Sequence, residues 1–578
     1  MSPIAPARRR ARLPHILLLA AALAMAAPPP GAAAEGLSGP YLAARQAIVA
    51  NDFSAAAHYL AAALATDPDN PQMLEQAVVA HLALGDISAA VPPAQRLSDL
   101  GLDSQPASMA LIVGLLVDEA HDEALVALRS GEGIGALVDA LLAGWTQVAR
   151  GRMSEALETF DALAGERGSE AFGLYHKALA LAHAGDFEGA EHILSGEAQG
   201  PLRLTRRGAI ARAQILGQID RQDDAAELLE QAFGDDPDPE IAQMRAILAD
   251  GGAPPFDLIT RPRDGMAEVF FDVAGTLQGE AMDSFTLLFA RLALVLRRDH
   301  VPAALMSGRL MGALGQHELA ADTYAEVPET APLYHLAAIG LAEALHRAGQ
   351  AEEARATLEA LAQSHAGLAT VHSALGDMLR RERDFDAASR AYDAAIALLG
   401  EPQPQHWSVY YTRAITHERE GRWPEAEADF RLALELNPDD AHVLNYLGYS
   451  LVERRENLDE ALDMIRRAVA AEPDNGYIVD SLGWVYYRLG RYDEALEHME
   501  RAVELLPADA VLNDHLGDVY WAVGRKMEAR FQWRRALSLG PADDLDMDRI
   551  RRKLEVGLDE VLIEEGAEPH HRTAAHGN

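Results

Sequence analysis

The chain has 578 residues, of which 49% are hydrophobic and only 6% aromatic, and it contains no cysteine. The absence of cysteine excludes disulfides, thiolate nucleophiles and cysteine-ligated zinc. A formal net charge of −39, with lysine only at Lys177, Lys526 and Lys553, argues against a nucleic-acid partner, because binding to phosphates needs a basic surface.

The first segment, residues 1–34, has the composition of an export signal. Four arginines between positions 8 and 12 precede the apolar run ILLLAAALAMAA and the small-residue stretch PPPGAAA, which is the order of regions in a cleaved signal peptide. We expect cleavage after Ala34. Because no later stretch reaches about 18 consecutive apolar residues, the sequence predicts an exported, periplasmic protein without a stable membrane span.

Residues 35–249 carry a weak internal repeat. Ala56, Ala90 and Ala124 follow one another at equal intervals, and Ala156, Ala190 and Ala225 continue the series at slightly variable spacing. A fixed period of about 34 residues is typical of helical repeats. We therefore expect an N-terminal array of degenerate helix pairs.

Residues 250–265, DGGAPPFDLITRPRDG, contain prolines and glycines that no helix would tolerate. This segment predicts a long loop or bend. A linker between independent domains is the alternative, but the repeat phase resumes at Met266, which favours one continuous superhelix.

Residues 266–541 carry the clearest repeat. Small residues and prolines return at matched positions in the last three units, and these signature positions are Gly448, Ala461, Ala468, Pro473, Gly483, Ala495, Ala502, Pro507, Gly517, Ala529, Ala536 and Pro541. The glycine and first alanine allow two helices to approach closely, and the proline ends the second helix.

This pattern resembles the tetratricopeptide repeat (TPR) family, which has the same repeat length. The resemblance implies an all-α solenoid, a TPR superhelix of about 14 helix pairs. Residues 542–563 place Met547, Ile550, Leu554, Leu558 and Val561 on one helical face, as in a capping helix that covers the open end of the stack. We expect the tail, residues 564–578, to be disordered.

Enzymatic motifs are absent from the sequence. The 21 histidines show no His-Glu-x-x-His spacing, and no serine lies in a Gly-x-Ser-x-Gly turn. The sequence thus predicts a non-enzymatic protein with no catalytic residue, no cofactor and no metal site.

The concave side of such an array, lined by the first helix of each pair, is its usual binding surface. Spacings of three and four residues place polar and aromatic side chains on one stripe of three consecutive first helices. We call these residues the groove stripe: Asn445, Tyr446, Tyr449, Tyr477, Asp480, Trp484, Tyr487, Arg488, Asp514, His515, Asp518 and Trp521.

Two interpretations of the groove stripe remain open. The aromatic residues could anchor an extended protein segment, and the acids Asp480, Asp514 and Asp518 would then favour a basic or neutral segment over a carboxylate. Alternatively, the aromatic residues pack between neighbouring first helices, and the acids only cap or solvate them.

Within residues 265–545, the run LNYLGYSLVERRENLDEALDMIRRAVAAEPDNGYIVDSLGWVYYRLGRYDEALEHMERAV, followed by HLGDVYWAVGRKMEARFQWRRAL, is similar to the LbcA-type TPR adaptors of Gram-negative envelopes. That resemblance implies an adaptor that binds a periplasmic carboxyl-terminal processing protease and its substrates in cell-wall homeostasis. Those adaptors are lipoproteins, whereas this chain lacks the cysteine for lipid attachment. The alternative function is a structural component of envelope polysaccharide or pilus assembly, and an enzyme with an unrecognised site comes third.

Overall fold

In a computed structural model of the chain, the structure describes residues 38–130, 133–197, 203–234, 238–541 and 545–570. The expected signal peptide, residues 1–34, lies outside these described residues. The chain divides into two compact units, residues 1–357 and 358–578, and the division falls inside helix α19 (Ala351–Ser364).

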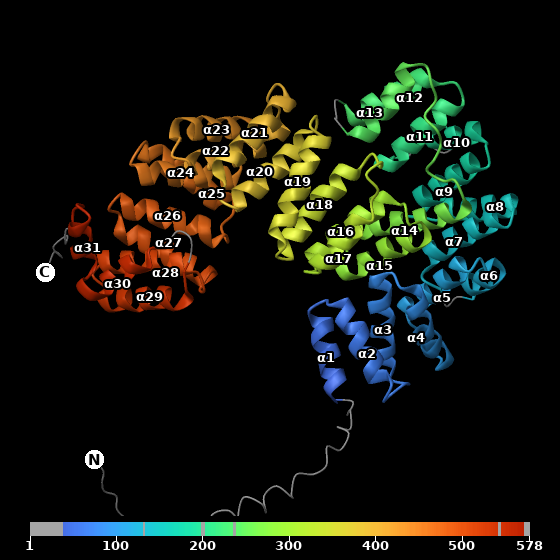
Figure 1. Cartoon of the computed structure of the whole chain (residues 1–578), viewed down its shortest axis with the longest axis horizontal. Coiled ribbons are helices and arrows are strands. Elements are labelled where there is room, and N and C mark those ends of the chain that lie inside the picture. The colour runs from blue at the N-terminus through green and yellow to red at the C-terminus, as the bar shows by residue number, and fades with distance from the viewer. Residues whose placement is uncertain (1–37, 131–132, 198–202, 235–237, 542–544, 571–578) are drawn as a thin grey trace, which may run out of the picture. The chain divides into compact units, whose positions relative to one another are not determined.

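All regular structure in the described residues is helical (Figure 1). The helices of the first unit are α1 (Ser38–Val49), α2 (Phe53–Leu64), α3 (Pro71–Leu84), α4 (Ile87–Asp99), α5 (Gln105–Val117), α6 (His121–Arg129), α7 (Ala136–Ala149), α8 (Met153–Ala164), α9 (Glu170–His183), α10 (Phe187–Leu194), α11 (Arg206–Gln218), α12 (Gln222–Phe233), α13 (Pro239–Ala249), α14 (Pro262–Leu277), α15 (Asp283–Leu296), α16 (Val301–Ala313), α17 (His317–Ala325) and α18 (Tyr334–Arg347).

The second unit continues the same pattern. Its helices are α20 (Ala369–Arg381), α21 (Phe385–Leu399), the short 3₁₀ helix η1 (Pro404–His406), α22 (Trp407–Arg419), α23 (Trp423–Leu436), α24 (Ala441–Arg454), α25 (Leu458–Ala471), α26 (Gly476–Arg488), α27 (Tyr492–Leu505), α28 (Ala510–Ala522), α29 (Lys526–Leu539), α30 (Met547–Val556) and α31 (Leu558–Glu564).

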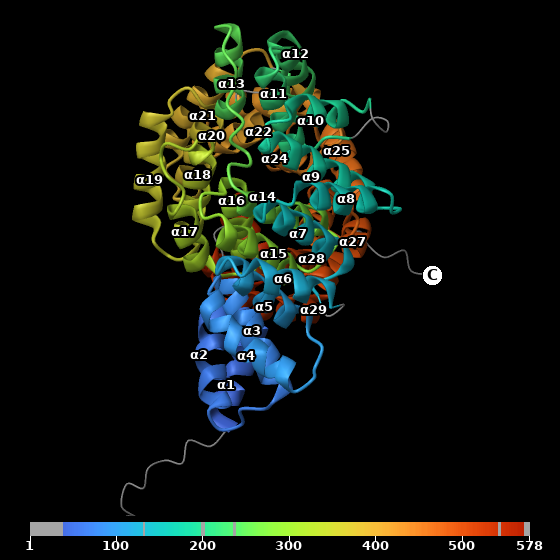
Figure 2. The same ribbon diagram turned by 90° about the vertical axis from the view of Figure 1, so that its right-hand side faces the viewer.

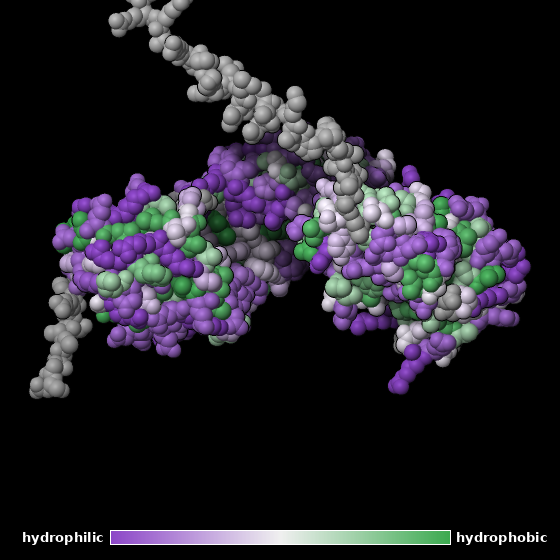
Figure 3. Space-filling view, turned by 90° about the horizontal axis from the view of Figure 1, so that it is seen from below, coloured by the Kyte–Doolittle hydropathy of each residue, from purple (hydrophilic) through white to green (hydrophobic). Residues whose placement is uncertain are grey.

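The helices follow one another in chain order as fourteen pairs, α1/α2 to α11/α12 and α14/α15 to α28/α29, with α13, α30 and α31 left over in the described residues. The predicted all-α solenoid of about 14 pairs is therefore confirmed. Except for α18/α19, which spans the division between the units, the two helices of each pair pack on each other. On the face seen in Figure 3, hydrophilic residues cover much of both units.

The repeated alanines explain the pairing. Ala56, Ala90, Ala124 and Ala156 in the first unit and Ala461, Ala495 and Ala529 in the second are each at most 2% exposed. They lie in second helices, where a larger side chain would push the partner helix away. The period thus marks backbone approach in both halves of the chain.

The repeated glycines serve two different packings. A Cβ at Gly448 would lie 3.1 Å from the Ala461 carbonyl oxygen, so there the glycine allows the backbones of α24 and α25 to approach. At Gly517 the space is filled instead by the indole of Trp533 from α29. The glycine therefore makes room either for a backbone or for a large side chain.

Helix ends follow the repeat as well. Asp440, Asn475 and Asp509 precede α24, α26 and α28, and each side chain accepts hydrogen bonds from two backbone N–H groups of the first turn. Such N-caps stabilise a helix by about 1 kcal/mol each. The signature prolines stand just after the second helices, for example Pro473 after α25, where they cannot interrupt a helical hydrogen bond.

The loop predicted at residues 250–265 is shorter in the structure. Residues 250–261 are not helical, and α14 begins at Pro262, because proline is well tolerated in the first turn of a helix. The loop is fixed on α11, where Gln214 Nε2 donates to Asp257 and Gln218 Nε2 donates to the Pro254 carbonyl, at 2.8 and 2.7 Å.

The predicted single capping helix is wrong in detail, because the segment forms two helices, α30 and α31. Gly557 separates them with φ = +93°, a conformation that only glycine adopts readily. Ile550, Leu558 and Val561 of the predicted apolar face are buried. Of the tail expected to be disordered, residues 564–570 are described, and residues 571–578 lie outside the described residues.

Candidate protein-binding groove

The groove stripe comes from three first helices of the second unit. Asn445, Tyr446 and Tyr449 belong to α24, Tyr477, Asp480, Trp484, Tyr487 and Arg488 to α26, and Asp514, His515, Asp518 and Trp521 to α28. Their exposure differs widely: the Tyr477 residue is 57% exposed, whereas Asp480, Asp514, Asp518, Trp484 and Trp521 are buried. Tyr477 is therefore accessible to a partner, whereas the buried residues of the stripe on α26 and α28 are not.

The acid on α26 is paired with a base of the next first helix. Asp480 Oδ2 lies 2.9 Å from His515 Nδ1, and the His515 ring stacks on Trp484 with 4.1 Å between ring centroids. Burial alone would lower the pKa of His515, but the Asp480 carboxylate, helped by Asp514 and Asp518, outweighs burial and raises it. The raised pKa favours the protonated imidazole, which attracts the Asp480 carboxylate. This attraction holds α26 against α28.

The acids on α28 are paired with the C-terminal helices. Lys553 Nζ on α30 donates to both Asp514 carboxylate oxygens at 2.8 Å and to Asp518 Oδ1 at 2.6 Å, and the Lys553 residue is 0% exposed. Asp518 Oδ1 also accepts from Trp533 Nε1 at 2.9 Å. Two of the three acids predicted to face a ligand therefore bind a lysine of the same chain.

Trp521 is covered in the same way. Its Nε1 donates to Asp559 Oδ2 of α31 at 2.9 Å, and Lys526 Nζ lies 4.1 Å above its ring. Nearby, His570 Nε2 lies 2.9 Å from the Tyr487 hydroxyl. The C-terminal segment thus contacts the groove stripe at Asp514, Asp518, Trp521 and Tyr487.

The rest of the stripe lies on α24 and the start of α26. Tyr446 is half-buried against Tyr411 and Phe430, and its hydroxyl lies 3.3 Å from Glu418. Trp484 Nε1 donates to Glu453 Oε1 at 2.7 Å, and Arg488 Nη1 lies 3.6 Å from the same oxygen. The Tyr477 hydroxyl lies 3.2 Å from Asp509, and at 57% exposure Tyr477 is the most exposed aromatic residue of the stripe.

The first unit contains a buried polar network that the sequence did not predict. Helix α14 runs beside α7 and α9 (Figures 1 and 2) and carries Glu268, which is 0% exposed. Arg207 donates two hydrogen bonds of 2.6 Å to Glu268, and His300 Nε2 lies 3.2 Å from it. Burial opposes ionisation of Glu268, but Arg207 and His300 together hold its pKa well below the usual range.

A second acid of α14 continues this network. Trp145 Nε1 donates to His176 Nδ1 at 2.9 Å. Because Nδ1 accepts this bond, a neutral His176 carries its proton on Nε2. His176 Nε2 lies 3.2 Å from Asp272 Oδ2. Burial raises the pKa of Asp272. The available signal in the sequence was the recurrence of Asp264, Glu268 and Asp272 at every fourth position of a helix whose other residues are mostly apolar.

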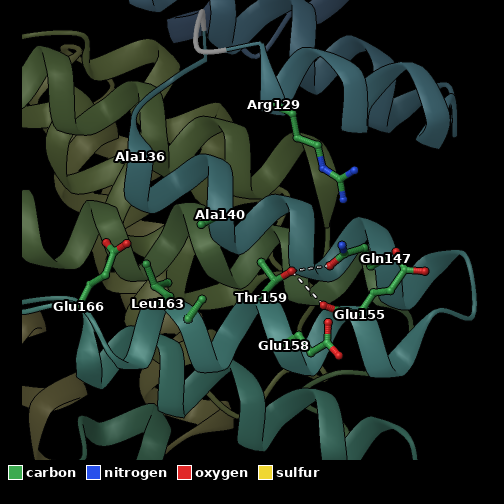
Figure 4. Close-up of a pocket in the computed structure, with 10 residues that line it drawn as sticks. Arg129, Ala136, Ala140, Gln147, Glu155, Glu158, Thr159, Leu163 and Glu166 are labelled. Atoms are coloured by element: carbon green, nitrogen blue, oxygen red, sulfur yellow. Dashed lines mark hydrogen bonds between the residues drawn. The ribbon is translucent and has the colours of Figure 1, made fainter.

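Two hollows in the first unit adjoin these helices. A cavity of about 480 Å³ beside α14 is lined by apolar side chains such as Phe271, Leu305 and Leu333 with Arg206 and Asp272. Another of about 480 Å³ lies between α7 and α8, where Thr159 Oγ1 lies 2.9 Å from Gln147 Oε1 and Glu166 points outward (Figure 4). Among the described residues, no group of histidines and acids is arranged to hold a metal ion.

None of the described helices combines the length and the hydropathy that a bilayer-spanning segment needs.

Comparison with known proteins places the repeats in a family. A tetratricopeptide repeat model matches residues 41–105, 141–201, 373–441 and 447–510. The chain is 36% identical over 88 residues to the TPR repeat-containing protein PA4667 of Pseudomonas aeruginosa, which is 15% of either chain. It is 39% identical over 88 residues to the lipoprotein NlpI homolog of Haemophilus influenzae, 15% of this chain and 27% of that protein. The chain thus matches only a small part of these relatives.

Solved structures of similar architecture include the APC/C hetero-tetramer Cut9–Hcn1, at 15% identity over 91% of this chain and 97% of that chain, with a TM-score of 0.40. A tetratricopeptide repeat protein from Parabacteroides merdae matches at 17% identity over 50% of this chain and 98% of that chain, with a TM-score of 0.33. The four matched segments are thus similar to tetratricopeptide repeats, and buried alanines in the described residues recur at that family's spacing.

Proposed function

We propose that this protein is a non-catalytic adaptor of the bacterial periplasm that holds protein partners, one of them a carboxyl-terminal processing protease whose substrates it brings close. Tetratricopeptide arrays act as protein-binding scaffolds. Binding two partners on one chain raises their effective concentration toward each other, so a protease gains rate without any bond-breaking by the adaptor.

The observation that carries the proposal is the open part of the groove stripe. Tyr477 on α26 is 57% exposed, and Tyr446 and Tyr449 on the preceding first helix, α24, are half-buried. Aromatic side chains on a rigid helical surface are the residues that contribute most to protein–protein affinity. A location in the envelope is supported by the name of one relative, a lipoprotein, and by the signal-like composition at the start of the chain.

Affinity capture tests this proposal. The tagged full-length protein, incubated with periplasmic extract, is expected to retain a serine-type processing protease identified by mass spectrometry. Recovery of polysaccharide or pilus assembly components in its place would contradict the adaptor function and support a structural one.

Tyr477→Ala tests the surface itself. We expect the substitution to weaken capture of the protease about tenfold, the loss typical of an interface aromatic residue, while leaving the circular dichroism unchanged. Tyr59→Ala on α2 is the matched control, since Tyr59 is also exposed, at 38%, but lies outside the stripe. Equal capture by both variants would show that the stripe is not the binding surface.

A further inference from the structure

Lys553 is a fully buried cation held by the array itself. Its ammonium makes three hydrogen bonds of 2.6 to 2.8 Å with Asp514 and Asp518 of α28. It also lies 5.6 Å from the centre of the Trp533 ring. The last first helix of the array therefore presents a site for an ammonium group, built from two carboxylates one helical turn apart and an indole.

Helix α30 contacts this site mostly through charge. Its buried residues are only Ile550 and Lys553, and Arg549 Nη1 lies 3.5 Å from Asp518 Oδ2. The remaining arginines, Arg551 and Arg552, pair with acids of α30 and α31. The array thus contacts an arginine, a lysine and two aliphatic residues of α30, in the order Arg549-Ile550-x-x-Lys553-Leu554.

The two buried carboxylates determine which group can occupy the site more than they stabilise the folded chain. The Coulombic gain is largely offset by desolvation of three charged groups, whereas leaving the acids without a cation is costly. Burial raises the pKa of Asp514 even with the ammonium present. An empty site would therefore favour any helix that brings a lysine to the same place.

We infer that Asp514 and Asp518 of α28, with Trp533 of α29, form a receptor for a basic amphipathic helix, and that α30 is its built-in occupant. The partner is a protein with a helix of the pattern Arg-aliphatic-x-x-Lys, which exchanges with α30 and so uncovers the end of the groove stripe. This inference rests on the proposed function and names the partner chemistry of the C-terminal end of the groove; the open surface at Tyr477 does not depend on it.

A peptide in trans tests the exchange on the full-length chain. The probe is a fluorescein-labelled peptide of residues 545–566, and binding is followed by fluorescence anisotropy. In the wild-type chain the tethered α30 competes at an effective concentration in the millimolar range, so the peptide should bind weakly. In the Lys553→Glu chain, whose own helix is repelled by the two acids, we expect at least tenfold tighter binding.

Two altered peptides provide the controls. The peptide with Lys553→Glu should lose binding, whereas the peptide with Arg551→Glu should keep it, because the Arg551 side chain is 58% exposed and pairs only with Asp548. The Asp514→Asn/Asp518→Asn chain should bind none of them. Should Lys553→Glu unfold the chain, as judged by circular dichroism, Lys553→Ala replaces it with the same expected order.

Three results would overturn the inference. One is equal affinity of the peptide for the wild-type chain and for the folded Lys553 variants. Another is an equal loss for the two altered peptides, which would make the contact non-specific. A third is a wild-type dimer in light scattering that dissociates on adding the peptide, since a second copy of the chain would then be the occupant. In each case capture through Tyr477 would still be measurable, so the two proposals fail separately.

Discussion

Glu268 is a charged residue of the first unit that is completely removed from water. Its carboxylate is enclosed between Arg207 and His300, and it fixes α14 against α11, a helix from an earlier repeat. Removing one partner of such a buried pair leaves the other charge uncompensated.

Glu268→Gln is therefore expected to lower the free energy of unfolding of the first unit by about 3–5 kcal/mol, the usual cost of breaking a buried ion pair. Urea denaturation followed by circular dichroism measures it. The control is Glu240→Gln, which breaks a more exposed pair with Arg206 and should cost less than about 1 kcal/mol. Similar losses for both variants would show that the buried network does not hold α14.

Gly557 allows the C-terminal segment to turn onto the array. Its φ of +93° suits only glycine, and a Cβ there would overlap the Trp521 ring. Gly540 has nearly the same φ, +98°, with no atom within 4 Å of the position of a Cβ. The two glycines thus differ in surroundings and not in backbone conformation.

We expect Gly557→Ala to destabilise the second unit by clearly more than Gly540→Ala, whose cost is the backbone strain of about 1–3 kcal/mol. The difference in stability between the two variants reports the overlap of a Cβ at position 557 with Trp521. It is measured from the midpoints of thermal unfolding of the two variants. Identical midpoints would mean that α31 can move away from Trp521 without loss.

At the scale of helices, we expect the pairing of α26 with α28 to depend on pH. The pKa of His515 is raised in the folded state, so its contribution to stability is fully present below the unfolded value of about 6.5 and is lost as pH rises through the folded pKa. The second unit should therefore lose stability as the pH increases above about 6.5.

His515→Gln is expected to remove this loss, as measured by urea denaturation at a series of pH values. His498 provides the control, because burial lowers its pKa and its contribution has the opposite sign. A variant His498→Gln should keep the decrease on the alkaline side. If His515→Gln keeps the decrease too, the pair of His515 with Asp480 does not link the two helices.

At the scale of the whole molecule, the chain consists of two compact units. Each helix pair of a repeat protein contacts mainly its neighbours, so cooperativity is limited in extent. We expect calorimetry to show two unfolding transitions. Glu268→Gln should shift only one of them, and Gly557→Ala only the other. A single transition shifted by both variants would show that the chain unfolds as one cooperative unit.

Much of the fold could be predicted from the sequence, because the repeat is a local property. Alanines such as Ala461 and Ala495 mark where two adjacent helices touch, and a glycine or proline marks where one helix ends. These contacts join residues less than one repeat apart. The split of the C-terminal cap at Gly557 was missed because a helical pattern of apolar residues continues through it.

The sequence could place the residues of the candidate site on helices, but it could not predict which side chains they contact. The spacing of Asp480, Asp514 and Asp518 correctly assigned them to first helices, yet their partners, His515 of the next repeat and Lys553 of α30, follow from how separate segments pack. The same holds for Glu268, whose partner Arg207 is 61 residues away.

The sequence by itself determined that this protein is a stack of paired helices, because small residues at a fixed period act through neighbours in the chain. Only the tertiary structure decided which groove residues remain accessible, since α30 and α31 fold back onto the last repeat and bury Asp514, Asp518 and Trp521. That outcome depends on contacts between segments whose spacing follows no period, and periodicity carries no information about them.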